Sequence, residues 1–170
     1  MPHDYDPDAL RQAQDDIRSR LHGHAVDLDV EEATSNLYRA ATVLSRTAEK
    51  DIMAGEGLSW SGFSVLWVLW IWGEMPSSRL AAELGLTPGT LTGVRTGLQE
   101  AGLVTSRSDA DDGRRKLVSL TAEGTALIER TYPRFNRWAG ELLGDLSSDE
   151  VRLLAKLLRA IIVAPSARQP

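Results

Sequence analysis

The sequence predicts a mainly α (α+β) fold in which several helices surround one β-hairpin. Apolar residues recur at spacings of three and four over most of the chain, which is typical of helices with one buried face. Two short apolar segments, 103–107 and 116–120, flank a polar stretch that contains Asp112-Gly113, and this pattern indicates a hairpin. With 170 residues, of which 42% are hydrophobic, the chain is long enough to bury a core of ordinary size.

The composition excludes several classes of protein. The chain has no cysteine, so it forms no disulfide, iron–sulfur site or thiol redox switch. His22 and His24 lie close together but have no third ligand nearby, so we expect no metal and no cofactor. The longest apolar run, Val65–Trp72, is shorter than the roughly 20 residues that span a bilayer, and the acidic N-terminus does not resemble a secretion signal. We therefore expect a cytoplasmic protein with no membrane partner.

The charge is unevenly distributed along the chain. The net charge is −5, but residues 1–33 alone hold nine acidic and three basic groups, a net of −6, which leaves +1 for the rest. Apolar spacing from Ala9 to Gly23 predicts an amphipathic helix within this acidic N-terminal arm, residues 1–30. The densest basic cluster is Arg114-Arg115-Lys116. For binding a polyanion, such local clustering matters more than the net charge.

Two helices are predicted between the arm and the middle of the chain. The first runs from about 31 to 54 and has one apolar face. Ser59 or Ser61 caps the second, which contains Val65–Trp72. That run is apolar on all sides, so its periodicity alone fits a buried strand as well as a buried helix, and the helical neighbours favour the helix.

Two further helices are predicted after the hairpin. Thr121 caps the first, and Pro133 inside it predicts a kink or a break. The second begins with the capping box Ser147-Ser148-Asp149-Glu150 and ends before Pro165.

The middle of the chain has the layout of a winged helix-turn-helix. A short helix over 77–84 and a glycine turn precede a second helix, which Thr87 caps and Pro88 opens. In this layout the second helix lies in the DNA major groove, where Arg95 is the candidate for a guanine contact. Three glycines lower the stability of this helix by about 1 kcal/mol each relative to alanine, so packing offsets them or they admit close approach of a partner. The recognition-helix candidates are Pro88, Gly89, Thr90, Thr92, Arg95 and Thr96.

The hairpin would serve as the wing that reaches the adjacent minor groove. A narrow minor groove attracts arginine, and Arg114 is the foremost candidate. Asp112 precedes it by two residues, and such residues share a face of an extended strand. We therefore interpret Asp112 as orienting the Arg114 guanidinium rather than touching DNA. The wing candidates are Arg107, Asp112, Arg114, Arg115 and Lys116.

Three segments carry a family pattern: LSWSGFSVLWVL, RLAAELGLTPGTLTGVRTGLQEAGLV and SRSDADDGRRKLVSLTAEG. With them, residues 58–128 resemble the MarR family of bacterial transcription regulators, and Asp112-Gly113-Arg114 followed by KLVSLT is the most specific piece. The resemblance implies a homodimer that binds a palindromic operator in double-stranded DNA and acts most often as a repressor. It also implies release from DNA by a small aromatic or phenolic ligand.

The resemblance divides the chain into functional regions. Residues 58–121 would form the winged helix-turn-helix DNA-binding domain, and residues 31–57 and 122–164 the N- and C-terminal dimerisation helices. The terminal helices have wider apolar faces than a minimal winged domain needs, which favours the dimer. The chain departs from the family at Gly93, where an arginine or another polar residue is common.

An aromatic ligand would lie between the dimerisation helices and the winged domain. Alternatively, each tryptophan here is ordinary core packing, and Arg39 lies on a solvated face or in a dimer ion pair. The candidates for the ligand pocket are Tyr38, Arg39, Trp60, Phe63 and Trp67.

The sequence contains no pattern for catalysis. It lacks GxSxG, a P-loop, GxGxxG after a strand and HExxH, so we expect no enzyme. The alternative to a regulator is a winged helix that serves as a protein-interaction module without DNA binding. The glycines of the recognition helix and the acidic arm favour that alternative, and salt-dependent DNA binding separates the two.

Overall fold

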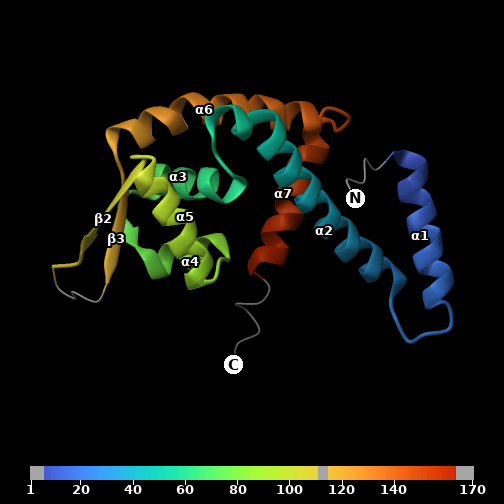
Figure 1. Cartoon of the computed structure of the whole chain (residues 1–170). Coiled ribbons are helices and arrows are strands. Elements are labelled where there is room, and N and C mark those ends of the chain that lie inside the picture. Colours follow the sequence, from blue (N-terminus) through green and yellow to red (C-terminus); the bar gives the residue numbers. More distant parts are fainter. Residues whose placement is uncertain (1–5, 111–114, 164–170) are drawn as a thin grey trace. The chain divides into compact units, whose positions relative to one another are not determined.

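The computed structural model describes residues 6–110 and 115–163. These residues belong to two compact units, Met1–Arg46 and Thr47–Pro170. Figure 1 shows the order of the helices and strands. Their bounds are α1 (Pro7–Leu21), α2 (Leu28–Ala48), η1 (Glu49–Met53), η2 (Ala54–Glu56), α3 (Trp60–Trp72), β1 (Met75–Pro76), α4 (Ser77–Leu84), α5 (Pro88–Glu100), β2 (Val104–Ser108), β3 (Lys116–Leu120), α6 (Ala122–Leu142) and α7 (Ser148–Val163).

Polar contacts join the two helices of the first unit. The carboxylate of Asp6 caps α1 by accepting a backbone hydrogen bond at 2.7 Å from the first turn. Glu32 of α2 accepts hydrogen bonds from Gln14 and Arg18 of α1. The helix predicted within the acidic arm is therefore confirmed.

The long helix predicted after the arm is α-helical only as far as Ala48. The segment η1 that follows is a π-helix, and η2 is a 3-10 turn. A π-helix holds more residues per turn than an α-helix, and here the consecutive side chains Ile52 and Met53 are both buried. In η1 the carboxylate of Glu49 accepts the backbone N–H of Trp60 at 2.7 Å. The prediction of one regular helix was wrong in its last turns, because packing there favours the wider geometry.

Helix α3 contains the apolar run Val65–Trp72, so the helical alternative is confirmed over the strand. Ser59 caps it, with the Ser59 hydroxyl accepting the Gly62 amide at 3.1 Å. Among the described residues no single helix is both long and apolar enough to cross a membrane. Only Leu28–Glu56 and Trp60–Trp72 counted together, across the bend between them, reach that length and composition.

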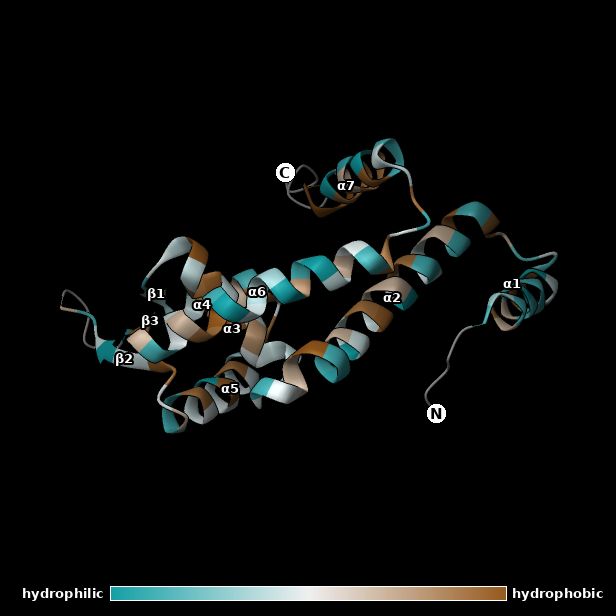
Figure 2. Cartoon of the chain, turned by 90° about the horizontal axis from the view of Figure 1, so that it is seen from above, coloured by the Kyte–Doolittle hydropathy of each residue, from teal (hydrophilic) through white to brown (hydrophobic). Residues whose placement is uncertain are grey.

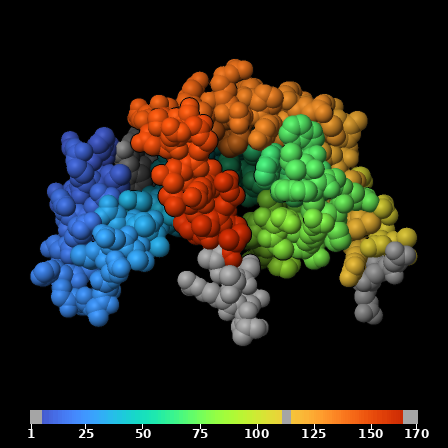
Figure 3. Space-filling view, turned by 180° about the vertical axis from the view of Figure 1, so that it is seen from behind, coloured from blue at the N-terminus to red at the C-terminus, as the bar shows by residue number. Residues whose placement is uncertain are grey.

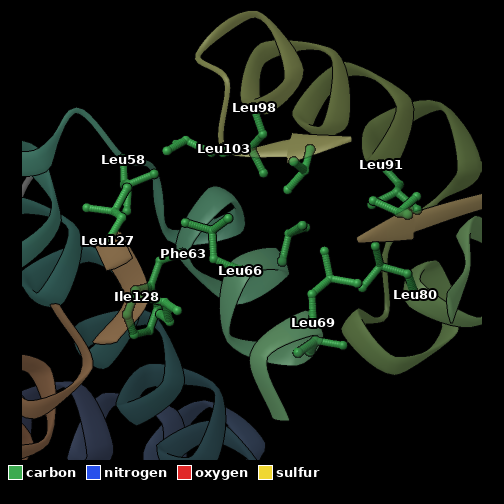
Figure 4. Packing of buried hydrophobic residues seen from close by; sticks show 14 of the residues in the cluster. Leu58, Phe63, Leu66, Leu69, Leu80, Leu91, Leu98, Leu103, Leu127 and Ile128 are labelled. Atoms are coloured by element: carbon green, nitrogen blue, oxygen red, sulfur yellow. The ribbon is translucent and has the colours of Figure 1, made fainter. Parts of the chain in front are cut away.

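The core of the second unit forms around α3. Buried side chains of α3 join buried side chains from α4, α5, the hairpin and α6 in one cluster (Figure 4). Burying a leucine, isoleucine or phenylalanine contributes about 1.5–3 kcal/mol relative to leaving it exposed. The cluster includes Leu58, Phe63, Leu66, Leu69, Leu80, Leu91, Leu98, Leu103, Leu127 and Ile128.

Three strands form a small antiparallel sheet in the order β1-β3-β2. Strands β2 and β3 confirm the predicted hairpin, which extends away from the helices in Figure 1. Strand β1 has only two residues, and Met75 and Pro76 pair with Val118 and Leu117 of β3. The sequence did not predict this strand, because two residues are too few to show an alternating pattern.

Helix α6 is continuous through Pro133, so the predicted break does not occur. Proline removes one backbone hydrogen bond from a helix interior. The side chains of Phe135 and Trp138, which follow it, are packed against the core. This packing keeps the second half of the helix in place.

The start of α6 lies against the turn that precedes the hairpin. The Thr121 hydroxyl accepts the Gly124 amide at 3.0 Å and donates to the Gly102 carbonyl at 2.7 Å. A Cβ atom added at Gly124 would lie 1.9 Å from the carbonyl oxygen of Leu103. Only glycine therefore fits at this contact between the helix and the hairpin.

The last helix begins with the predicted capping box. The Glu150 carboxylate accepts the amide and the hydroxyl of Ser147 at 2.8 and 2.6 Å. The hydrogen bond from the Ser147 hydroxyl, followed by the one from its backbone, lowers the pKa of Glu150 below the usual value for glutamate.

The contact at Gly124 gives a test of the fold. Gly124→Ala forces the backbone of Leu103 or of α6 to move, so we expect the free energy of unfolding to fall by about 2 kcal/mol or more. Urea denaturation followed by circular dichroism measures this change. Gly140→Ala, in the same helix, is the matched control: its Cβ has open space, so it should gain up to about 1 kcal/mol. Equal stability of the two variants would contradict the close contact.

Candidate nucleic-acid interface

Helices α4 and α5 form a tight helix-turn-helix. Gly85 ends α4 with φ +62°, a left-handed conformation that glycine adopts without strain. The Leu86 amide then donates to the Ala81 carbonyl at 2.9 Å and closes the turn. Leu80 and Leu91 anchor the two helices in the core. These contacts fix the direction in which α5 leaves the body of the unit.

The first turn of α5 is capped as the sequence predicts. The Thr87 hydroxyl accepts the Thr90 amide at 3.1 Å and lies 2.8 Å from the Thr90 hydroxyl. Pro88 occupies the first helical position, and its carbonyl accepts the Thr92 hydroxyl at 2.8 Å. The three threonine hydroxyls therefore stabilise the helix start. Among the residues exposed there are Gly89, Thr90 and Thr92.

One face of α5 is open and carries small side chains. Gly93, Thr96 and Gly97 are all exposed. Apart from the neighbouring backbone of the helix itself, no atom of the described residues lies within 4 Å of a Cβ added at Gly93 or Gly97. These two glycines are therefore not needed for packing within the chain. Of the two interpretations from the sequence, close approach of an external partner fits their position.

Arg95 is only partly exposed and turns toward α4. Its Nη1 donates to the Ser77 hydroxyl at 3.3 Å, and its buried Nε has no acceptor among the described residues. The Ser77 hydroxyl in turn donates to the backbone carbonyl of Lys116 on β3 at 3.1 Å. In this structure the predicted guanine-contacting side chain thus lies in a contact between α4, α5 and the hairpin.

The hairpin carries cations on both strands. The Lys116 ammonium donates to the Ser108 hydroxyl at 2.9 Å, and the Arg115 carbonyl accepts the Asp109 amide at 3.0 Å. Arg107 on β2 donates from Nε to Glu74 at 3.0 Å and from Nη2 to the second oxygen of the same carboxylate. The predicted tip residues Asp112 and Arg114 lie outside the described residues.

The sequence did not predict two residues that bind the candidate DNA-contacting side chains. One precedes α4 and the other is its first residue. Glu74 follows the glycine that ends α3, and Ser77 is the first residue of α4. Neither position belongs to a charge cluster or a recognisable motif. Only the three-dimensional pairing with Arg107, Arg95 and Lys116 reveals them.

A second group of side chains forms an aromatic cluster between α3 and α6. Trp60 and Phe63 have ring centroids 5.9 and 5.1 Å from that of Phe135. Tyr132 connects Phe135 to Trp70, at centroid distances of 6.2 and 5.6 Å. The structure therefore brings two predicted pocket residues, Trp60 and Phe63, into one cluster with rings of α6.

Of the other pocket candidates, Trp67 lies outside this cluster, and Tyr38 and Arg39 belong to the first unit. Trp67 packs edge-on against Trp72 at 5.6 Å, and its buried indole Nε1 has no acceptor among the described residues. In the first unit the Tyr38 side chain is 75% exposed, and Arg39 donates to the Asn36 side chain at 3.3 Å.

Comparison with known proteins identifies the fold. Residues 58–116 match the model of the MarR family. YwaE of Bacillus subtilis, an HTH-type transcriptional regulator, is 30% identical over 164 residues, which are 95% of this chain and 96% of that protein. The chain belongs to the MarR family. It is accordingly a DNA-binding transcriptional regulator with a winged helix, and members of this family are regulators rather than enzymes.

Two further relatives of this MarR-family chain have informative descriptions. The HTH-type transcriptional repressor YetL of Bacillus subtilis is 30% identical over 107 residues, which cover 62% of this chain and 64% of YetL. The solved structure of BpsR of Bordetella bronchiseptica concerns regulation of its DNA binding by 6-hydroxynicotinic acid. It has a TM-score of 0.70 and 25% identity and covers 76% of this chain and 98% of BpsR.

Proposed function

We propose that this MarR-family chain is a homodimeric repressor that binds a palindromic operator and is released by a small aromatic or phenolic ligand. It would act in the cytoplasm, where its operator lies. The open face of α5 carries the proposal: its exposed glycines and threonine leave room for DNA beside a rigid helix start. The description of YetL as a repressor supports the direction of regulation.

The proposed DNA contacts combine two elements. With Pro88 at its first position, the helix N-terminus offers the backbone amide of Gly89 to a phosphate, while Thr90, Thr92 and Thr96 face the bases. Arg95 would reach a base edge with its other amino group, Nη2, while Nη1 keeps the hydrogen bond to Ser77 of α4. Along the wing we propose contacts from Arg114, Arg115 and Lys116, with Asp112 orienting Arg114. Arg107, which the sequence also suggested as a DNA contact, has its guanidinium held by Glu74, and we propose that it positions the wing.

Exposed apolar side chains support the homodimer. No residue of α7 is buried, and its apolar residues form brown stripes in Figure 2. Leu153, Leu157 and Ile161, spaced four apart on one face, are each more than half exposed. In Figure 3 the surface of α7, in red, is open to the viewer. Apolar patches of this kind mark interfaces.

The aromatic cluster supports a flat ligand. Its rings come from α3 and α6 and offer faces on which a flat ligand could stack. Outside the cluster but on the same helix α3, the indole N–H of Trp67 has no acceptor among the described residues, and we propose it as a hydrogen-bond donor to the ligand. The regulation of BpsR by 6-hydroxynicotinic acid supports this chemical class.

Salt-dependent binding tests the DNA contacts. We expect the duplex upstream of the gene to bind far more tightly than a random duplex in fluorescence anisotropy. Arg114→Ala should weaken binding to both and reduce the slope of log K against log salt by about 1. Thr96→Ala should weaken only the upstream duplex, because a base contact carries the sequence preference. If neither duplex binds at low salt, the chain is a protein-interaction module instead.

The oligomeric state tests the dimer. Wild type should have twice the chain mass of 18.6 kDa at micromolar concentration. Leu157→Glu should shift the mass toward the monomer, because it places a charge on the apolar stripe of α7. Lys156→Glu, at an exposed polar position of the same helix, is the control and should leave the dimer intact. A monomeric wild type, measured by light scattering, would rule the proposal out.

Release of the protein from DNA can be tested with 6-hydroxynicotinic acid as a probe for small aromatic or phenolic ligands. It should quench tryptophan fluorescence and release the labelled duplex, because a ligand that binds the DNA-free conformation better shifts the population toward it. Trp67→Phe keeps an aromatic ring at this position but removes the N–H donor, so it should weaken binding of the probe without changing DNA affinity. Benzoate lacks the ring hydroxyl and serves as a comparison. Quenching with no release of DNA would count against regulation.

A further inference from the structure

Strand β1 connects the sheet to the helix-turn-helix with very little backbone. It has two residues, Met75 and Pro76, at one edge of the sheet. Proline has no N–H to donate, so this strand contributes few ladder hydrogen bonds. Beyond the core packing of Met75, the angle of the wing relative to α4 is therefore open to adjustment by polar side chains on both sides of β1, and Glu74 and Ser77 lie there.

Glu74 ties β1 to the far strand of the sheet. Pro76 and Arg107 both pair with Leu117 of the central strand, so the ion pair between Glu74 and Arg107 bridges over β3. Both carboxylate oxygens of Glu74 take part, one with Nε and one with Nη2. Two parallel hydrogen bonds of this kind fix the plane of a guanidinium.

The pair acts on orientation more than on stability. Its side chains are 58% and 33% exposed, and exposed ion pairs add little to folding. The hydrogen bond from Glu74, then its charge, and more weakly the charge of Asp109, raise the pKa of Arg107. Carboxylates next to a wing are unfavourable for binding a polyanion, so a role in positioning accounts for Glu74 better than a contact with DNA.

Ser77 ties the other end of β1 to the recognition helix. Its hydroxyl donates to the Lys116 carbonyl at 3.1 Å and accepts from Arg95 Nη1 at 3.3 Å. One hydroxyl therefore connects β3 of the wing with α5. Gln99 of α5 adds a second connection to the hairpin, donating to Ser106 at 3.0 Å.

We propose that residues 74–77 form a joint that fixes the wing relative to the recognition helix, with Glu74 and Ser77 as positioning residues for DNA binding. This inference rests on the proposed DNA contacts of α5 and the wing. A correctly angled wing places its tip in the minor groove when α5 enters the major groove. In this arrangement the main role of Arg107 is to hold Glu74.

Exchanging the charges of the pair tests the joint. Glu74→Arg and Arg107→Glu should each weaken binding to the upstream duplex by about tenfold, and the double variant should recover most of the loss. The weakening by Glu74→Arg is decisive, since adding a positive charge near DNA strengthens binding when only overall charge matters. Glu100→Gln removes an exposed carboxylate at the end of α5 and serves as the charge control.

The other outcomes have separate meanings. Tighter binding by Glu74→Arg, or a double variant as weak as Arg107→Glu, would overturn the joint; in the second case Arg107 touches phosphate directly. If the melting temperature of each variant falls together with its DNA affinity, the Glu74–Arg107 pair only stabilises the fold. That result would also overturn the joint. A wild type that binds no duplex contradicts operator binding, and the joint with it.

Ser77→Ala examines the second half of the joint. It removes both hydroxyl contacts, so we expect weaker binding with an unchanged salt slope, because no phosphate contact is lost. Ser78→Ala, at the neighbouring exposed position, is the control and should bind like wild type. Equal binding by both variants would overturn the role of Ser77.

Discussion

Helix α3 has apolar side chains around its whole circumference, and the second unit is stable only when other elements cover most of them. Its buried residues belong to the same core cluster as Leu80 of α4, Leu91 of α5 and Leu127 of α6. This single requirement brings the helix-turn-helix, the sheet and the long helix α6 together. The DNA-binding elements are therefore positioned by burial, while their outer faces remain free to carry polar and small residues.

Polar contacts then adjust the elements that burial brings together. Thr121 and Gly124 fix α6 to the turn before the hairpin, and Glu74 and Ser77 fix the hairpin to α4 and α5. The ion pair between Glu74 and Arg107 is partly exposed, so it adds little to the free energy of folding. We propose that the contacts of Glu74 and Ser77 act on the angle between the hairpin and α5, because in the proposed binding mode these two elements enter two grooves of a duplex at once.

Local signals in the sequence predicted most of the elements. Caps such as Thr87-Pro88 and Ser147 to Glu150 involve residues within one turn, so spacing alone identifies them. The π segment at Glu49 and the continuity of α6 through Pro133 depend on packing between distant segments, which no local pattern records. The same holds for Arg107: its charge suggested DNA, but its partner Glu74 lies 33 residues away.

The contacts also explain how a ligand near the aromatic cluster would affect the wing. Tyr132 and Phe135 lie on α6, the helix whose first turn touches the Leu103 carbonyl through Gly124. A Cβ would not fit at that contact, so the start of α6 packs directly against the backbone at the base of the hairpin. If the proposed ligand shifted α6, the close contact at Gly124 would carry the shift to the base of the hairpin and so to the joint at residues 74–77. The contact at Gly124 would in this way connect the proposed ligand site to the elements that bind DNA.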